Sequence, residues 1–144
     1  MRRIIIDCDP GIDDAQAIIM AYQHPGVEIE AITTVSGNVG VDLTTANVLR
    51  ILDILDAPPI PVFAGSATPL VESCENASFF HGEDGLGDSD LPQSSREVKD
   101  EHAALALIRL AKENHGELEL IAIGPLTNLA LALRLDPSLP RMYK

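Results

Sequence analysis

Short apolar runs alternate with segments of helical periodicity along most of this chain. The apolar runs at residues 4–6 and 29–35 are short enough for buried strands, and residues 15–21 and 42–55 have the spacing of helices. Residues 60–64 form a third short run, whose proline is typical of an edge position or a strand start. This order predicts an α/β fold with a doubly wound, Rossmann-like, mainly parallel sheet and helices on both faces.

Regular structure is predicted to return after a long irregular segment, at about residues 65–99. An amphipathic helix is expected over 100–114 and a fourth strand over 118–123, and a turn at 124–128 leads into a helix that reaches about Leu135. Connections as long as 65–99 are uncommon in compact domains and are usually functional or disordered. A length of 144 residues fits one domain.

Composition narrows the class of partner. The chain is 46% apolar but only 3% aromatic, so its core is expected to consist of Ile, Leu, Val and Ala. A formal net charge of −12 argues against nucleic acid or an anionic membrane as a partner. Cys8 and Cys74 form no disulfide framework or metal-ligand spacing, and no signal peptide or membrane span is visible. These features predict a cytoplasmic protein with reduced thiols.

Four carboxylates crowd the turn between the first predicted strand and the first predicted helix: Asp7, Asp9, Asp13 and Asp14. A helix N-terminus carries only roughly half a positive charge, so it cannot neutralise four acids. Either some acids are protonated or a cation lies among them, and an all-oxygen set favours Ca2+ or Mg2+ over zinc. The alternative is that one Asp caps the helix while the others are solvated. A helix N-cap is also predicted at Asp42.

Two later segments are candidates for the same site. Asn38 lies in a glycine-flanked loop after the second predicted strand, at the end of the sheet where open α/β proteins bind ligands. It either faces that crevice or is a turn residue in a left-handed conformation. His81 follows Phe79 and Phe80 in a glycine-rich segment that suits a loop closing over a ligand. It either assists a leaving group or is simply exposed to solvent.

Four motifs in order resemble those of the inosine-uridine-preferring nucleoside hydrolases. They are the opening segment 7–15, the segment 33–38, the segment 81–87 and the segment 124–128, and the likeness runs from Ile4 to about Pro140. The resemblance implies hydrolysis of the N-glycosidic bond of ribonucleosides such as uridine, inosine or cytidine, to free base and ribose, in purine and pyrimidine nucleoside catabolism. It also implies a homo-oligomer, a dimer or a tetramer.

The resemblance also implies a tightly held Ca2+ that binds the ribose 2′- and 3′-hydroxyls and the attacking water. By position, Asp9 would be a calcium ligand and the general base that activates this water. Asp14 would be a bidentate ligand, and the backbone carbonyl of Ile123 would be a third. Such an ion lowers the pKa of its bound water and orients the sugar.

The remaining motif residues would contact the substrate. Asp13 would hydrogen-bond the ribose, and Asp7 would support the other acids or add a ribose contact. Asn38 would contact ribose and water, and His81 would lie near the nucleobase. Glycosidic cleavage builds positive charge on the ribose ring, which fixed carboxylates stabilise electrostatically.

The chain departs from the family in length, because family members are about twice as long. The additional half supplies a further Asp ligand, an Asn/Glu pair that grips the ribose and a catalytic His, none of which can be placed here. Residues 1–144 are therefore expected to be the N-terminal part of a single hydrolase domain, with 65–99 as its active-site loop. The chain alone is predicted to bind Ca2+ weakly, to be weakly active or inactive, and to leave a sheet edge uncovered.

Two other interpretations remain. A haloacid-dehalogenase-like phosphatase would use Asp7 as nucleophile and Asp9 as acid/base with Mg2+, although Gly11 departs from that motif and the pair Asp13-Asp14 goes unexplained. Alternatively, the chain is a non-catalytic relative that retains only ligand binding or subunit contacts. The residues present do not fix the preferred base.

Overall fold

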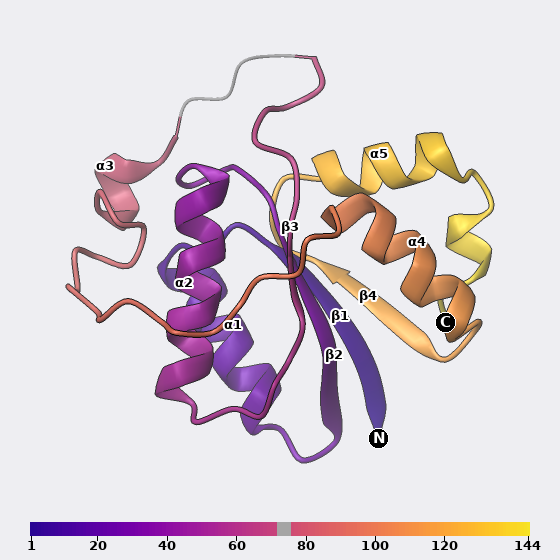
Figure 1. Ribbon diagram of the computed structural model, residues 1–144, viewed down its shortest axis with the longest axis horizontal. Helices are drawn as coiled ribbons and strands as arrows, with labels where there is room; N and C mark the ends of the chain where they lie inside the picture. Colours follow the sequence, from indigo (N-terminus) through magenta and orange to yellow (C-terminus); the bar gives the residue numbers. More distant parts are fainter. Residues whose placement is uncertain (72–75) are drawn as a thin grey trace.

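The computed structural model describes residues 1–71 and 76–144 and contains one four-stranded sheet. The strands are β1 (Arg2–Cys8), β2 (Val27–Thr34), β3 (Val62–Ala64) and β4 (Leu118–Ala122). All pairs are parallel and the order is β3-β2-β1-β4, so β1 and β2 lie inside the sheet (Figure 1). The predicted parallel α/β fold is confirmed.

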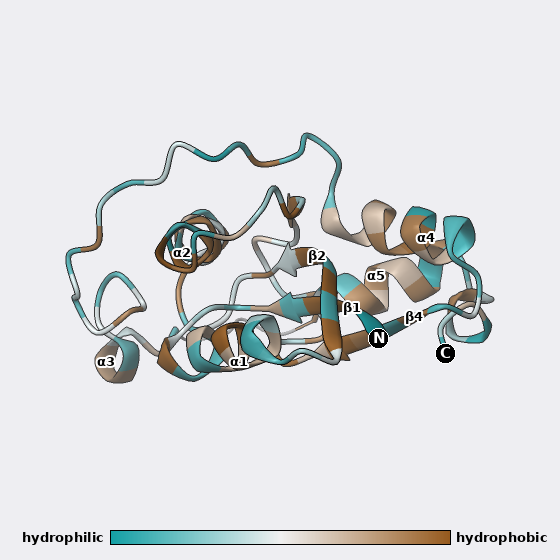
Figure 2. Ribbon diagram, turned by 90° about the horizontal axis from the view of Figure 1, so that it is seen from below, coloured by the Kyte–Doolittle hydropathy of each residue, from teal (hydrophilic) through white to brown (hydrophobic). Residues whose placement is uncertain are grey.

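Helices cover both faces of the sheet. On one face α1 (Ile12–Gln23) and α2 (Val41–Ile54) pack on alternate residues of β1, and on the other α4 (Ala103–Glu113) and α5 (Thr127–Leu135) pack on the residues between (Figure 1). Ile4, Ile6 and Cys8 thus belong to one apolar cluster and Ile5 to the second, as the alternation of side chains along a strand requires. Figure 2 shows hydrophobic and hydrophilic residues on different sides of α2 and α4.

Two helix starts differ from the prediction. Asp42 is not an N-cap: α2 begins at Val41 with Gly40 as its cap, and Asp42 lies in the first turn, where a negative charge still favours the helix dipole. The helix expected from residue 100 begins only at Ala103, because the His102 side chain caps it by accepting the Ala104 N–H at 3.1 Å. Sequence patterns locate helix ends poorly because several adjacent residues can each serve as the cap.

The described residues between β3 and α4, 65–71 and 76–102, are largely irregular but anchored. They include one helical turn, α3 (Ser78–His81), which the sequence did not predict. Arg96 donates to the Asp53 carboxylate and to backbone carbonyls at the end of α2, and Lys99 pairs with Phe63 of β3. The prediction for Cys74 lies outside the described residues.

The chain ends with a single 3₁₀ turn, η1 (Leu139–Arg141), after α5. In the described sheet β4 is an edge strand, and the apolar side chains of Ile121 and Ile123 beside this edge are 38% and 41% exposed. That the edge is uncovered, as expected from the sequence, stays a prediction. Within the described residues, every helix is too short or too polar to cross a membrane.

Candidate active site

The carboxyl ends of β1, β2 and β4 meet at one edge of the sheet. Asp7 of β1 is in register with Thr33 of β2 on one side and with Ala122 of β4 on the other. The loops that follow these strands therefore converge at the place where open parallel sheets bind ligands. They carry Asp9, Asn38 and Ile123, which the sequence had assigned to one site, and the fold brings them together.

Asp9 and Asn38 are joined by two hydrogen bonds. The Asn38 backbone N–H donates to Asp9 Oδ2 at 2.8 Å, and Asn38 Nδ2 donates to the Asp9 carbonyl at 3.0 Å. A Cβ added to Gly37 would lie 2.1 Å from Asp9 Oδ2, so only glycine leaves room for the carboxylate at this position. The glycine-flanked loop predicted from the sequence thus encloses the Asp9 side chain, which is buried.

Asp14 lies beside Asp9 on the first turn of α1. Both side chains are buried. Burial, and then the negative charge of Asp9, raises the pKa of the Asp14 carboxyl well above its ordinary value, while burial also raises the pKa of Asp9. Two buried carboxylates without a cation between them retain a proton, and a divalent cation would replace that proton.

Asp7 is fully buried and is held by two neighbours. Thr33 Oγ1 donates to Asp7 Oδ1 at 2.5 Å and Asn128 Nδ2 donates to the same oxygen at 2.9 Å. Burial raises the pKa of Asp7 to about 6, and these two hydrogen bonds oppose that rise. Asp7 has no solvent exposure, so a phosphate ester has no access to its carboxylate in this structure, which argues against the phosphatase interpretation. Its position suits support of the other acids.

His81 is buried against the start of α1 and not exposed in a loop. Its Nδ1 accepts the Ile12 N–H at 3.2 Å, so the neutral ring is assigned its proton on Nε2, which lies 4.0 Å from Oδ1 of the exposed Asp13. A Cβ on Gly11 would lie 2.6 Å from His81 Nδ1 and 2.7 Å from Asn38 Nδ2. The absence of a side chain at Gly11 therefore lets His81 and Asn38 approach each other.

The turn after β4 lies against the acids. The Ile123 N–H donates to the Asp7 carbonyl at 2.8 Å, and a Cβ on Gly124 would lie 2.9 Å from Asp9 Oδ1. Ile123 thus belongs to the same small volume as Asp9, as a backbone ligand must. The side chain of Ile123 plays no part in this contact.

Two buried asparagines of the site were given no role by the sequence. Asn128 belongs to the motif at 124–128, and its place shortly after a strand end was the available signal. Asn47 lies inside α2 and donates to the Asp84 carbonyl at 2.7 Å and to the Pro10 carbonyl at 3.3 Å, which ties the His81 segment to the opening turn. Nothing in the helical pattern of residues 42–55 distinguishes Asn47.

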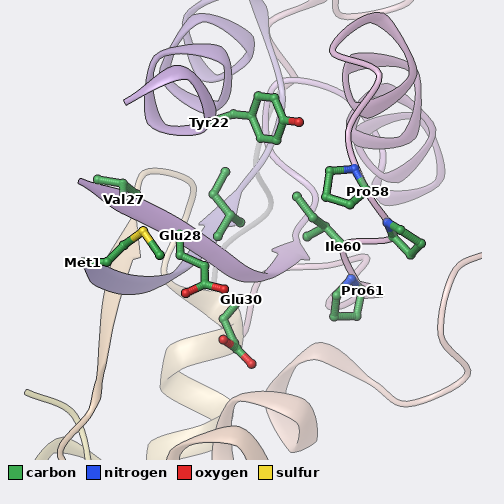
Figure 3. Close-up of a pocket in the computed structure, with 10 residues that line it drawn as sticks. Met1, Tyr22, Val27, Glu28, Glu30, Pro58, Ile60 and Pro61 are labelled. Carbon is green, nitrogen blue, oxygen red and sulfur yellow. The ribbon is translucent and has the colours of Figure 1, made fainter. Parts of the chain in front are cut away.

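Two hollows of similar size lie at opposite ends of the sheet. One of about 540 Å³ is lined by residues that include Gly37, Pro125 and Thr127, and none of the four acids of the opening turn lines it. The other, of about 470 Å³, lies between Tyr22 and Ile60, with the carboxylates of Glu28 and Glu30 nearby (Figure 3). It lies at the amino ends of the strands, whereas open parallel sheets bind ligands at the carboxyl ends, so this second hollow is not a candidate for the ligand site.

The donor set suits a hard cation but does not complete its shell. Among the described residues, no three carboxylate, imidazole or thiolate side chains form a metal-binding cluster. Asp9 and Asp14 provide carboxylate oxygens in a buried, negatively charged place. This chemistry fits Ca2+ or Mg2+, and Ca2+ takes six to eight oxygens, so the pair supplies only part of what calcium needs.

Comparison with known proteins gives one consistent family. Uridine nucleosidase 1 of Arabidopsis thaliana is 46% identical over 144 residues, which are 99% of this chain and 43% of that protein. The solved structure of a plant nucleoside hydrolase superposes with a TM-score of 0.94 at 40% identity, covering 99% of this chain and 45% of that one. A purine-preferring ribonucleoside hydrolase from Gardnerella vaginalis gives 0.93 at 32% identity, covering 99% and 46%.

These relatives agree in fold but differ in the substrate that their names state. The chain spans less than half the length of each of them. The family model of the inosine-uridine preferring nucleoside hydrolases matches residues 4–144, nearly the whole chain. The protein therefore belongs to the inosine-uridine preferring nucleoside hydrolase family.

Proposed function

We propose that this chain forms the N-terminal part of a ribonucleoside hydrolase domain and contributes the calcium and water-activating half of its active site. The reaction is hydrolysis of the N-glycosidic bond of a purine or pyrimidine ribonucleoside to free base and ribose. The observation that carries the proposal is the buried Asp9–Asp14 pair, whose raised pKa values mark a place that a cation would neutralise. Family membership supports the reaction class.

Asp9, Asp14 and the Ile123 carbonyl would hold the ion. Bound Ca2+ supplies positive charge that neutralises the acid pair and lowers the pKa of a water molecule. The Asn38 N–H holds Asp9 Oδ2, which fixes the carboxylate so that it can accept a proton from the attacking water. Asp13 is exposed beside the pair, so its carboxylate can accept a hydrogen bond from a ribose hydroxyl.

His81 would act on the leaving base. Because its Nδ1 is occupied by the Ile12 N–H, only Nε2 carries a proton that can be donated toward a ligand. As the bond to the base lengthens, positive charge grows on the ribose ring, and the fixed carboxylates of the opening turn stabilise it. The base itself needs a proton or a hydrogen bond from His81 or from residues outside this chain.

Base preference and assembly stay predictions. Two of the relatives named above are a uridine nucleosidase and a purine-preferring hydrolase. Each matches this chain over nearly all of its length, so base preference is expected to depend on residues outside it. We expect a homo-oligomer, since the resemblance implies a dimer or a tetramer. Because part of the site is expected from residues outside this chain, we also predict that residues 1–144 alone hydrolyse nucleosides weakly or not at all.

Calcium titration by calorimetry, together with a ribose-release assay on uridine and inosine, tests the proposal on the 144-residue chain. We expect calcium to bind weakly at one site and Asp9→Asn to abolish this binding. Glu28→Gln removes the same charge at the opposite end of the sheet and should leave binding unchanged. Equal calcium binding by the wild type and Asp9→Asn would refute the site, and rapid ribose release would refute the predicted weak activity.

A further inference from the structure

Asn128 makes three side-chain hydrogen bonds at this edge of the sheet. It is the second residue of α5 and has no solvent exposure. Its Nδ2 donates to Asp7 Oδ1 and to the Thr34 carbonyl, each at 2.9 Å, and its Oδ1 accepts the Ser66 N–H at 2.9 Å. A buried amide with three partners is held in one place.

The partners also fix which way the amide points. The Ser66 N–H requires an acceptor, whereas Asp7 Oδ1 and the Thr34 carbonyl require donors, so exchanging Oδ1 and Nδ2 would lose all three hydrogen bonds. A Cβ added to Gly65 would lie 2.2 Å from Asn128 Oδ1, which shows how closely the backbone after β3 approaches this group. The side chain therefore has a single orientation.

Through these bonds Asn128 joins the ends of β1 and β2, the chain after β3 and the start of α5. Asp7 is bonded to the region after β4 in two ways. Its carboxylate accepts from Asn128, and its backbone carbonyl accepts the N–H groups of Ile123 at 2.8 Å and Gly124 at 3.3 Å. Asn128 and Asp7 together clamp the turn that lies against Asp9.

We infer that Asn128 is a positioning residue that holds the turn at Ile123 against the Asp9–Asp14 pair, without itself touching the ion or the substrate. This inference rests on the proposed function, since it holds that the position of the turn determines the affinity for calcium. Groups that orient metal ligands in this indirect way typically change metal affinity by about 10- to 100-fold when they are altered. Thr33 belongs to the same arrangement because it donates to the same oxygen of Asp7.

The neighbouring threonines of β2 provide a matched pair of variants. Both are fully buried, but Thr33 Oγ1 bonds Asp7, whereas Thr34 Oγ1 bonds Thr45 Oγ1 at 2.7 Å. Thr33→Val and Thr34→Val therefore remove one buried hydroxyl each, of which only the first touches Asp7. Asn128→Asp is the direct variant, and it turns a donor into an acceptor facing Asp7 and the Thr34 carbonyl.

The experiment measures calcium affinity and hydrogen exchange of the Ile123 and Gly124 amides for the whole 144-residue chain. We expect Thr33→Val and Asn128→Asp to weaken calcium binding about tenfold or more and to speed exchange of these two amides. Thr34→Val should change neither by more than about twofold at a similar loss of thermal stability. If Asn128→Asp does not fold, the comparison of the two threonine variants decides the question.

Each outcome has one meaning. Equal effects of Thr33→Val and Thr34→Val on affinity and on exchange would show a merely structural role and overturn the inference. A wild-type chain that binds no calcium would overturn the proposed function instead. In that case the exchange rates alone decide, and faster exchange confined to Thr33→Val and Asn128→Asp would still establish the clamp.

Discussion

Replacing Asp7 with asparagine should change how the stability of the metal-free chain depends on pH. Burial raises the pKa of Asp7 from 3.8 to about 6, so the folded chain holds a proton that the unfolded chain has already released. A raised carboxyl pKa makes the free energy of unfolding fall as pH rises between these two values. Asp7 therefore does not lower the free energy of unfolding below about pH 4, and it lowers this free energy by the full amount above about pH 7.

The size of this effect follows from the shift. Two pKa units correspond to about 3 kcal/mol at 25 °C. Asp7→Asn removes that contribution but places an amide where Asp7 Oδ2 accepts no hydrogen bond from the described residues. The free-energy cost of burying this amide does not vary with pH. The quantity to compare is therefore the slope of the free energy of unfolding against pH and not its absolute value.

Urea unfolding in the presence of a calcium chelator, at intervals between pH 4 and pH 8, gives this slope. The free energy of unfolding should fall by about 2–3 kcal/mol more over this range in the wild type than in Asp7→Asn. Thr33→Val should steepen the fall instead, because it removes a hydrogen bond that lowers the pKa of Asp7. Parallel profiles for wild type and Asp7→Asn would refute the assignment of a raised pKa to this residue.

Two further predictions concern packing. Gly37→Ala should weaken calcium binding more than tenfold, because the new methyl group would displace the Asp9 carboxylate. Calorimetry would show this against Gly40→Ala, where nothing lies within 4 Å of the added Cβ, and equal affinities would contradict the close contact. Leu107→Ala on α4 should lower the free energy of unfolding by about 3 kcal/mol, because Leu107 is fully buried in the second apolar cluster. Leu105→Ala removes a side chain that is 49% exposed, so denaturant unfolding should show a loss in the free energy of unfolding of under about 1 kcal/mol. Similar losses for Leu107→Ala and Leu105→Ala would contradict this assignment of the core.

The sequence predicted what depends on local pattern. The three isoleucines before the opening turn, the Pro10-Gly11 corner and the apolar spacing of α1 each point to strand, turn and helix without knowledge of the rest of the chain. The grouping of Asn38 with Asp9 followed from a topological rule, since parallel strands end at one edge, whereas Ile123 was assigned only by the family resemblance. The cap predicted at Asp42 failed because Gly40 could also begin that helix.

What could not be predicted depends on contacts between distant residues. Asn128 reaches Asp7 across 121 residues and Ser66 across 62, and no local pattern tells which buried amide meets which carboxylate. The burial of His81 likewise depends on α1, whose first N–H group approaches the ring from 69 residues away. A glycine-rich segment is equally compatible with an exposed and with a buried histidine.

The pairing of β1 with β4 also has a consequence for the time course of folding. The acids of the opening turn can be arranged early, beside α1 and β2, but the turn at Ile123 reaches them only after β4 has joined β1. Closing a loop of this length is entropically costly and slow compared with local pairing. Calcium bound by Asp9, Asp14 and Ile123 would therefore favour a state formed late, and its main kinetic effect would be to slow unfolding rather than to speed folding.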